Sequence, residues 1–544
     1  MKSIETAADA DTDHPTGVQS EGIAQTPPST ADPAGGGLGV AWHPALWVVL
    51  AAALSWTVVM GTLVWQRHDR LGSFSFDMGI FDQAVWLLSR GGQQLMTVRG
   101  LTVFGHHAEP ALYLLAPFYW LGAGPHFLNL VQVATMALGA VPAFLIARDR
   151  LGAPWVAAVI AGAFLLHPAL AFMAWELFHP EAMAITPLLF AYWFAGRRRW
   201  RWFAVCVVLA VAWKEDVALA AAVLGLVVAV RGERRVGLTT AALSVGYFLM
   251  VTRVLLPYLN GSEAFYNQFF GELGGSAPEI IRNGLRRPEL VTDRVLAADA
   301  KDYYWKMVAP FGLVPLAGPG ALLVGVPQVL VNVLSINDFT RKITFHYAAL
   351  PLTGLTLAAI EGVRWIAAGR RRALVILAGV MAVSSVAAAM VWGPTPIGAT
   401  YGPTWWPPAQ DSRRDAKEAA LARVPNDARV SATYLFVPQL THREGIYEFP
   451  NPFKPKNWGV RDENYPPPTA VSWLVVDRDT LGPEDAGIFD CLLATSFQIV
   501  SDEERVVVAR RHGAGSSPLS EEDSRPPGGN SPPPGENTRL GRRC

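Results

Sequence analysis

Two carboxylates and one imidazole lie within six residues in the segment Glu176-Leu177-Phe178-His179-Pro180-Glu181, which has apolar sequence on both sides and contains no basic residue. Carboxylate oxygens bind hard divalent cations, and such a cation can hold a phosphate group. A carboxylate or an imidazole can also act as a general base toward a hydroxyl group. The spacing of the three groups is compatible with both kinds of chemistry and does not choose between them.

Other short segments carry ionisable residues of the same kinds. The segment 75–83 contains Asp77 and Asp82, and the remaining candidates for binding substrate or phosphate are His106, His107, Glu109, Lys214, Glu215, Asp216, Arg341, Lys342 and His346. The cations Lys214, Arg341 and Lys342 could neutralise a phosphate. Asp77, Glu176 and His179 could hold Mg²⁺ or Mn²⁺, the one cofactor that these residues indicate. The sequence has no P-loop, which argues against an ATP-driven pump.

The composition indicates an integral membrane protein. Charged residues make up 17% of the 544 residues and hydrophobic residues 51%, whereas soluble proteins contain about 25% charged residues. The 45 basic and 45 acidic side chains balance, which gives no reason to expect a nucleic-acid partner. Three cysteines, at 206, 491 and 544, are too few for a disulfide framework.

Uncharged segments predict about 11 membrane-spanning helices. Residues 45–65 hold no charged side chain and can cross a hydrocarbon core about 30 Å thick. The segment 307–337 is long and rich in proline, so we expect two packed helices there with a turn at 318–320. The other apolar segments are 127–147, 153–175, 182–196, 202–213, 217–230, 236–252, 345–360 and 373–392.

Arginine clusters orient these spans, because short cytoplasmic loops are enriched in Arg and Lys. We expect the N-terminus in the cytoplasm with the four clusters, which lie at 148–150, 197–201, 231–235 and 370–372. The candidate residues then share the outer face. The three consecutive charges at 214–216 should face protein or water, although they could also simply cap a helical hairpin at the interface. Asp77 and Asp82 could likewise belong to a solvated loop without a chemical role.

The predicted fold is a mostly α, polytopic transmembrane bundle with a small C-terminal α/β domain. Within that domain, an amphipathic helix is expected over 412–423 and strands over 429–437, 471–477 and 505–509. The predicted boundaries are a disordered cytoplasmic N-terminus at 1–44, a transmembrane domain at 45–392, a linker at 393–411, an extracytoplasmic α/β domain at 412–511 and a disordered tail at 512–544.

The chain resembles a bacterial family of predicted membrane proteins of unknown function that has the architecture of C-type glycosyltransferases. The resemblance covers roughly residues 45–510. It is carried by FDMGIFDQAVWLLSRG (76–91), HHAEPALYLLAPFY (106–119), HPALAFMAWELFHPEA (167–182), KEDVAL (214–219) and ARVSATYLFVPQLTHREGIYEFP (428–450).

More widely, the chain is similar to protein mannosyltransferases and to the aminoarabinose transferases of lipid A. That similarity implies an essential acidic residue soon after the first span, and by position this residue is Asp77, with Asp82 as the second candidate. The paired Asp-Glu of the mannosyltransferases is replaced here by Asp77-Met78 and, five residues later, by Asp82-Gln83.

The resemblance implies a glycosyltransferase of the cell membrane that moves a sugar from a polyprenyl-phosphate donor to an acceptor at the outer face. Asp77 would then be the general base, and Lys214, Arg341 and Lys342 would hold the lipid phosphate. Two other functions remain open. A transporter or flippase predicts ionisable groups at both membrane faces and at the midplane. A non-catalytic scaffold predicts that alanine at Asp77, Glu176 and Lys214 leaves cellular function intact.

Overall fold

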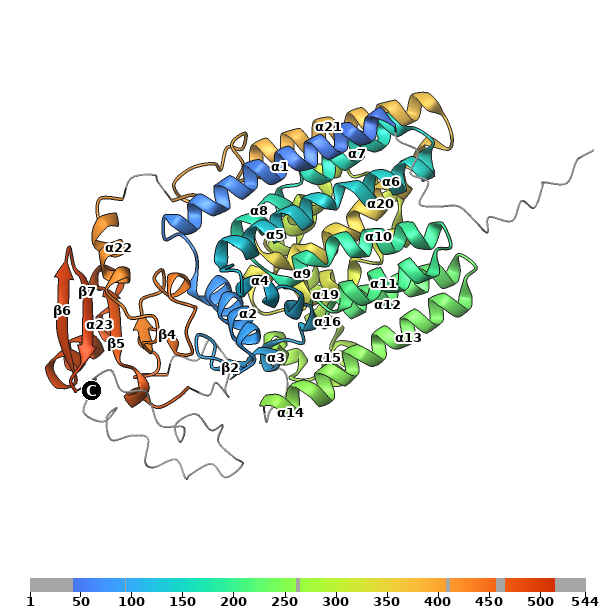
Figure 1. Cartoon of the computed structure of the whole chain (residues 1–544). Coiled ribbons are helices and arrows are strands. Elements are labelled where there is room, and N and C mark those ends of the chain that lie inside the picture. The colour runs from blue at the N-terminus through green and yellow to red at the C-terminus, as the bar shows by residue number, and fades with distance from the viewer. Residues whose placement is uncertain (1–42, 93, 261–264, 408–410, 456–464, 514–544) are drawn as a thin grey trace, which may run out of the picture. The chain divides into compact units, whose positions relative to one another are not determined.

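The computed structural model describes residues 43–513, apart from residues 93, 261–264, 408–410 and 456–464. Except for their innermost residues, the termini predicted to be disordered, 1–44 and 512–544, lie outside this range. The described chain is a helical bundle (blue to yellow in Figure 1) followed by a small sheet with two helices (orange to red). The predicted fold class, a mostly α membrane bundle with a small C-terminal domain that contains a sheet, is confirmed.

The bundle consists of long apolar helices and shorter connecting ones. The long helices are α1 (Pro44–Asp69), α5 (Pro125–Leu138), α6 (Ala140–Leu151), α7 (Pro154–Leu165), α10 (Ile185–Gly196), α11 (Trp200–Val211), α12 (Val217–Val230), α13 (Arg234–Met250), α20 (Ala349–Ala367) and α21 (Arg371–Trp392). The shorter ones are α2 (Ile80–Arg90), α3 (Val103–His106), α4 (Ala116–Tyr119), α8 (Pro168–Glu176), α9 (Pro180–Met183), α14 (Leu256–Asn260), α15 (Ala277–Arg286), α16 (Pro288–Val295), α17 (Ala298–Val308), α18 (Pro319–Leu322) and α19 (Val326–Leu334).

Proline residues set the beginnings of many of these helices. Pro125, Pro154, Pro168 and Pro180 each stand in the first turn, where the ring fixes a helical φ and the missing N–H would have had no partner in the helix. Pro168 separates α7 from α8, and the two helices meet at an angle of 43°. The sequence of the bundle therefore favours interrupted helices near the residues singled out above.

Four helical stretches of the described chain are long and apolar enough to cross a membrane, and the bent pair α7–α8 would make a fifth. The four are Pro44–Asp69, Pro125–Leu151, Arg234–Asn260 and Arg371–Trp392, and α11 and α12 are shorter apolar helices. The predicted number of about 11 spans is therefore not confirmed.

The segment 307–337 differs from the predicted pair of helices. It contains two short 3₁₀ turns, Ala309–Phe311 and Val314–Ala317, followed by α18 and α19. Its prolines interrupt the helical hydrogen bonds repeatedly. Glycine allows the resulting backbone to lie directly on α20, because a Cβ at Gly362 would collide with the carbonyl oxygen of Val314.

The C-terminal sheet has five strands in the order β4-β3-β5-β7-β6, with β3 parallel to β4 and β5, and β7 antiparallel to β5 and β6. The strands are β3 (Val430–Ala432), β4 (Ile446–Glu448), β5 (Trp473–Asp477), β6 (Phe497–Glu503) and β7 (Val506–Arg511), and the helices are α22 (Arg414–Ala422) and α23 (Pro483–Thr495). A separate two-stranded hairpin, β1 (Leu95–Met96) and β2 (Leu101–Thr102), lies in the first long loop.

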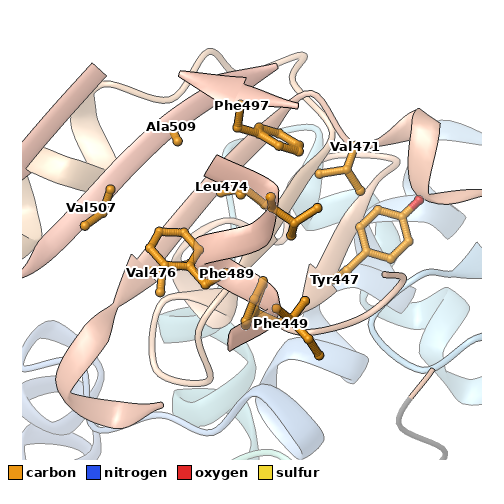
Figure 2. Packing of buried hydrophobic residues seen from close by; sticks show 11 residues of the cluster. Tyr447, Phe449, Val471, Leu474, Val476, Phe489, Phe497, Val507 and Ala509 are labelled. Atoms are coloured by element: carbon orange, nitrogen blue, oxygen red, sulfur yellow. The ribbon is translucent and has the colours of Figure 1, made fainter. Parts of the chain in front are cut away.

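An apolar cluster joins α23 to this sheet. Phe489 and Leu492 of α23 pack with Leu474 and Val476 of β5 and with Val507 of β7 (Figure 2). The predicted helix at 412–423 and the strands at 471–477 and 505–509 are close to α22, β5 and β7. The strand expected over 429–437 is limited to the three residues of β3, and β4, β6 and α23 were not predicted. β6 is a largely exposed strand at the edge of the sheet, so its sequence lacks the hydrophobic pattern by which strands are predicted.

The sheet is tied to the first long loop by hydrogen bonds from buried side chains. The Thr97 hydroxyl accepts from the backbone N–H of Ile446 at 2.9 Å and donates to the carbonyl oxygen of the same residue at 2.8 Å. The Gln83 amide donates to the carbonyl oxygen of Arg443 at 3.2 Å. This loop also carries Asp77, so the C-terminal residues help to position it.

Candidate active site

Asp77 lies in a π-helical turn, Ser75–Gly79, between α1 and α2. Ser75, Met78 and Gly79 of this turn are buried, whereas 22% of the Asp77 side chain is exposed. The turn thus anchors the backbone in the protein and leaves the carboxylate accessible at the edge of a polar cluster.

The segment 176–181 forms a tight turn between α8 and α9. Leu177 has a φ of 79°, a conformation that residues other than glycine rarely adopt. Gln132 of α5 fixes this turn, because its amide donates to the carbonyl oxygen of Leu177 at 2.6 Å and its oxygen accepts from the His179 N–H at 2.5 Å. His179 precedes the first residue of α9, and Glu181 stands in its first turn. Gln132 therefore fixes the backbone that carries the His179 ring.

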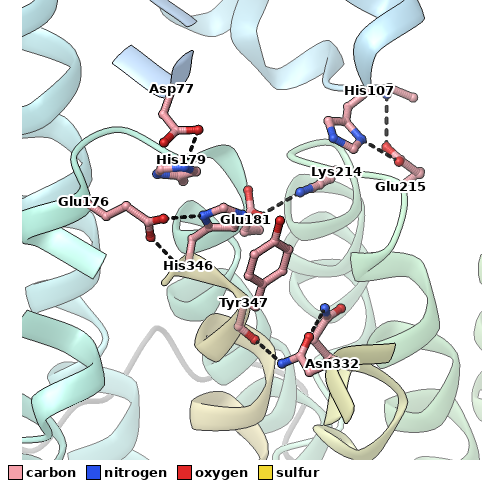
Figure 3. Close-up of polar contacts among 12 residues, drawn as sticks. Asp77, His107, Glu176, His179, Glu181, Lys214, Glu215, Asn332, His346 and Tyr347 are labelled. Atoms are coloured by element: carbon pink, nitrogen blue, oxygen red, sulfur yellow. Dashed lines mark hydrogen bonds and ion pairs between the residues drawn. The ribbon is translucent and has the colours of Figure 1, made fainter. Parts of the chain in front are cut away.

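Six of the predicted residues meet in one buried cluster (Figure 3), which we call the ion-pair cluster: Asp77, Glu176, His179, Glu181, Lys214 and His346. Asp77 Oδ1 lies 3.4 Å from His179 Nε2, and the His179 ring stacks on the His346 ring with centroids 3.9 Å apart.

His346 and Lys214 extend the ion-pair cluster. The two nitrogens of His346 lie 3.0 Å from Glu176 Oε1 and 3.3 Å from Glu181 Oε1. Lys214 Nζ lies 2.7 Å from the same Glu181 oxygen. Acid, imidazole and ammonium groups from loops distant in the chain therefore meet at these six residues.

The charges within this cluster stabilise one another. Burial disfavours a charge on Asp77, but the contact with His179 and the proximity of His346 hold the pKa of Asp77 below its ordinary value. Burial also disfavours protonated His179, yet Glu176 and Asp77 raise the pKa of His179 to about 10. Glu181 and Lys214 are similarly kept ionised: against the effect of burial, each partner shifts the pKa of the other, with that of Glu181 lowered and that of Lys214 raised.

A second buried polar group adjoins the first. His107 Nδ1 lies 2.8 Å from Glu215 Oε1, and the other oxygen of Glu215 accepts from the Ala108 N–H at 3.1 Å. Burial lowers the pKa of His106 and of His107 well below the ordinary value, and it raises the pKa of Glu109 well above it. Asp216, whose pKa burial raises to about 7, follows Glu215 at the start of α12. The charged tip predicted at 214–216 thus faces protein.

Asp82 lies apart from the ion-pair cluster. Its fully buried carboxylate accepts from the Tyr119 hydroxyl at 2.5 Å and from the Thr441 hydroxyl, and it lies 3.1 Å from His442 Nε2. These contacts join α2 to α4 and to the C-terminal segment, which gives Asp82 a positioning role in the fold.

Arg341 and Lys342 also have partners outside the ion-pair cluster. Arg341 Nε lies 2.5 Å from Asp299 Oδ2, and Lys342 Nζ lies 2.5 Å from Asp338 Oδ2. About half of the Lys342 side chain is exposed. Of the three cations predicted to hold a phosphate, only Lys214 contacts the ion-pair cluster.

Sequence reasoning did not find two residues that support the site. The Arg67 guanidinium, at the end of α1, packs on the Trp175 ring 3.9 Å from its centroid and donates to the Trp175 carbonyl oxygen. Gln132 fixes the turn that carries His179, as described above. Gln132 lies within a long apolar segment, and Arg67 lies in the polar stretch 66–70 that follows another one, so neither residue stood out from its surroundings.

A further charged group was also not predicted. In α20, the buried Glu361 accepts from the Tyr192 hydroxyl at 2.7 Å and pairs with Arg150, Arg231 and Arg364 at 2.9–3.2 Å. The first two arginines belong to the basic clusters from which the orientation of the spans was predicted. The three cationic partners explain how the Glu361 carboxylate is tolerated among apolar helices, because a buried charge needs oppositely charged neighbours.

Glu176, His179 and His346 each offer a ligand atom, and these atoms all lie within 4.8 Å of one another. Such a set suits a divalent cation. Two features of the observed arrangement disfavour the binding of a cation by these three residues. The stacked rings would have to part, because two imidazoles that bind one ion direct their nitrogens to a common point, and His179 would have to lose its proton.

The fold and the site can be compared with known proteins. The family model described as "Predicted membrane protein (DUF2079)" matches residues 67–488, and the chain therefore belongs to this family. The crystal structure of ArnT from Cupriavidus metallidurans bound to undecaprenyl phosphate is similar in fold, with a TM-score of 0.53 at 14% identity. The match covers 87% of this chain and 99% of the ArnT chain. The search of curated proteins found no match.

Proposed function

We propose that the protein is a membrane-embedded glycosyltransferase that moves a sugar from a polyprenyl-phosphate donor to an extracytoplasmic acceptor, with Asp77 as the general base. The position of Asp77 carries this proposal. Its side chain is 22% exposed, whereas those of Glu176 and Glu181 are 2% and 5% exposed. Asp77 is thus the carboxylate of the ion-pair cluster that an acceptor hydroxyl can reach.

In the proposed reaction, the acceptor hydroxyl gives its proton to a carboxylate oxygen of Asp77. The acceptor oxygen forms a bond to the anomeric carbon from the face opposite the phosphate. The bond between that carbon and the phosphate oxygen breaks with its electron pair on the oxygen, and polyprenyl phosphate leaves. A carboxylate that is paired with a cation is a weak base. Asp77 would therefore accept the proton of the acceptor hydroxyl only after its carboxylate has moved away from protonated His179.

The leaving phosphate gains negative charge, which nearby cations stabilise. Lys214 and protonated His179 supply positive charge in the ion-pair cluster. The proposed contribution of Arg341 and Lys342 requires that their side chains leave Asp299 and Asp338. The undecaprenyl phosphate in the ArnT structure, which shares the fold, supports a lipid-linked donor.

The test is donor turnover by the full-length protein in lipid nanodiscs, with radiolabelled polyprenyl-phosphate sugars and release of polyprenyl phosphate as the readout. We expect Asp77→Asn to lower the turnover by about 10²–10⁴-fold, the usual contribution of a general base. Asp69→Asn is the matched control, because Asp69 is an exposed carboxylate eight residues earlier in the chain. Turnover that is the same in the Asp77 and Asp69 variants would contradict the assigned role of Asp77.

A divalent cation is an alternative source of this positive charge. Glu176, His179 and His346, the last in place of the predicted Asp77, would hold it once His179 has lost its proton, and the cation would then replace protonated His179 as the positive charge for a phosphate. In that case the purified protein retains Mg²⁺ or Mn²⁺ by elemental analysis and loses donor turnover with EDTA. If turnover survives chelation and the protein contains no stoichiometric metal, the amino-acid side chains act alone.

A transporter of a lipid-linked substrate is the second candidate. A transporter predicts ionisable groups at both membrane faces, and the group around Glu361 is a second buried charged group besides the ion-pair cluster. Proteoliposomes distinguish the two functions. A transporter moves the labelled donor intact across the bilayer, whereas a transferase cleaves it. Intact donor that crosses the membrane, with no release of polyprenyl phosphate, would replace the first proposal by the second.

A further inference from the structure

An apolar groove of about 600 Å³ lies between the end of a membrane-spanning helix and α15, away from the ion-pair cluster. One wall is formed by Leu249 of α13 and Arg253, and the other by α15. Along α15, Ile281 and Leu285 are one helical turn apart and line the groove with Pro278. Figure 1 shows α15 near the end of α13 and next to α14. The groove offers a continuous apolar surface of the kind that binds a hydrocarbon chain.

Three exposed arginines line the same groove: Arg253, Arg282 and Arg286. Within the described residues, none of the three forms an ion pair. Two other arginines of this region are engaged: Arg287 pairs with Glu272, and Arg294 donates to the carbonyl oxygen of Phe270. The groove therefore combines apolar walls with cationic groups whose charge is not balanced by a carboxylate, which is the pattern of an anionic amphiphile site.

The location of the groove places these residues at a membrane surface. The span Arg234–Asn260 has only 17% of its most apolar window buried in the protein, so most of it faces lipid. Leu249 is 47% exposed, and Ile281 and Leu285 are 64% and 80% exposed. At the end of this span, the Asn260 amide donates to the carbonyl oxygen of Gly105 in the first long loop at 2.6 Å. The groove thus lies at the end of the bundle where the first long loop is, the loop that also carries Asp77.

We propose that this groove binds an anionic phospholipid of the surrounding bilayer. One acyl chain would lie along Leu249, Ile281 and Leu285, and the lipid phosphate would lie among the three guanidinium groups, which pair well with phosphate. The sugar carrier is a less suitable occupant. Its phosphate is bonded to the reacting sugar and must lie beside Asp77 during transfer, and no residue of the ion-pair cluster lines this groove.

Native mass spectrometry of the delipidated full-length protein tests this site. The protein is titrated with phosphatidylglycerol and with phosphatidylcholine that have identical acyl chains. We expect the wild type to bind the anionic lipid on the order of tenfold more tightly, because each arginine contributes favourably to binding an anionic lipid surface. The variant R253Q/R282Q/R286Q should lose this preference, and R282K/R286K should keep most of it because the charge is unchanged.

The matched control is R234Q/R235Q, which removes two exposed arginines from the other end of α13. It should retain the preference. Equal binding of the two lipids by the wild type, or an unchanged preference in the triple variant, would overturn the proposal. If undecaprenyl phosphate bound tenfold more tightly than phosphatidylglycerol and depended on the same arginines, the groove would be a site for the sugar carrier and the phospholipid proposal would be wrong. Asp77→Asn should bind phosphatidylglycerol normally, so this result is independent of the proposed transfer reaction.

Discussion

The two stacked histidines determine how charge is distributed in the candidate active site. His346 lies between the carboxylates of Glu176 and Glu181, and His179 lies beside Asp77. Parallel stacking of two imidazoles is unfavourable if both are cationic, and the surrounding carboxylates offset this repulsion. Because His179 has a pKa of about 10, it remains protonated at neutral pH and holds Asp77 as the anion. The arrangement thus keeps a carboxylate ionised at the edge of a buried site.

Lys214 should be required for stability as well as for the site. Lys214→Met leaves the buried Glu181 carboxylate without its closest cation, and breaking one side of a buried pair costs about 3–5 kcal/mol. The measurement is chemical unfolding in detergent. Lys306→Met is the control: Lys306 pairs with Asp302 on a helix surface, and such a pair contributes about 0.3–0.5 kcal/mol. Adding Glu181→Gln to Lys214→Met should recover much of the loss, and the absence of any recovery would show that the pair is not the cause.

Glu109 should make the stability of the protein depend on pH. Burial raises its pKa in the folded protein well above the ordinary value of 4.5. As the pH rises above 4.5, the unfolded chain releases this proton while the folded protein retains it, so the free energy of unfolding decreases up to the folded pKa. Glu109→Gln mimics the protonated form and removes this loss.

We therefore expect the melting temperature of Glu109→Gln, relative to that of the wild type, to be higher at pH 8 than at pH 5. Glu289→Gln, at an exposed glutamate of α16, controls for the loss of one negative charge. A difference between Glu109→Gln and wild type that stays constant across this range would show that Glu109 titrates normally.

At the scale of elements, the sequence predicted which ionisable segments lie at the same end of the bundle, and it predicted less well how the helices are divided. Uncharged segments and arginine clusters placed Asp77, the 176–181 segment and Lys214 on one side, and the structure brings them together. The segment 307–337 was predicted from length as two helices, but its prolines and its close contact with Gly362 leave four short pieces. Length and hydropathy cannot reveal such breaks, because they depend on which neighbour the backbone packs against.

Pairings between distant residues were also beyond the sequence. The contact of His179 with His346 joins residues 167 positions apart, and nothing in either segment specifies stacking. Arg341 and Lys342 were predicted to hold phosphate because they are cations of a loop expected on the same outer face, yet the nearby carboxylates Asp299 and Asp338 bind them instead. The sequence of a loop shows which charged side chains it contains, whereas the tertiary structure decides which partner each of these side chains pairs with.

For the whole molecule, the two ends of the helical bundle differ in their ionisable residues. Arg150 and Arg231 meet at Glu361, and with the neighbouring arginine clusters they mark one end as basic. The ion-pair cluster and the second polar group, by contrast, are built mainly from carboxylates and histidines of the connecting loops. The enrichment of Arg and Lys in short cytoplasmic loops predicts that the basic end faces the cytoplasm, which would place the proposed sugar transfer on the opposite side.

Cysteine accessibility measures this orientation directly. Glu289→Cys lies in the long segment after α13, and Arg370→Cys lies between α20 and α21; both positions are exposed. In intact cells, a membrane-impermeant maleimide should label Glu289→Cys and leave Arg370→Cys unlabelled, and inverted vesicles should give the opposite result. The unsubstituted chain sets the background from its native cysteines. Labelling of Arg370→Cys from outside would invert the topology and place Asp77 in the cytoplasm, where an extracytoplasmic acceptor could not reach it.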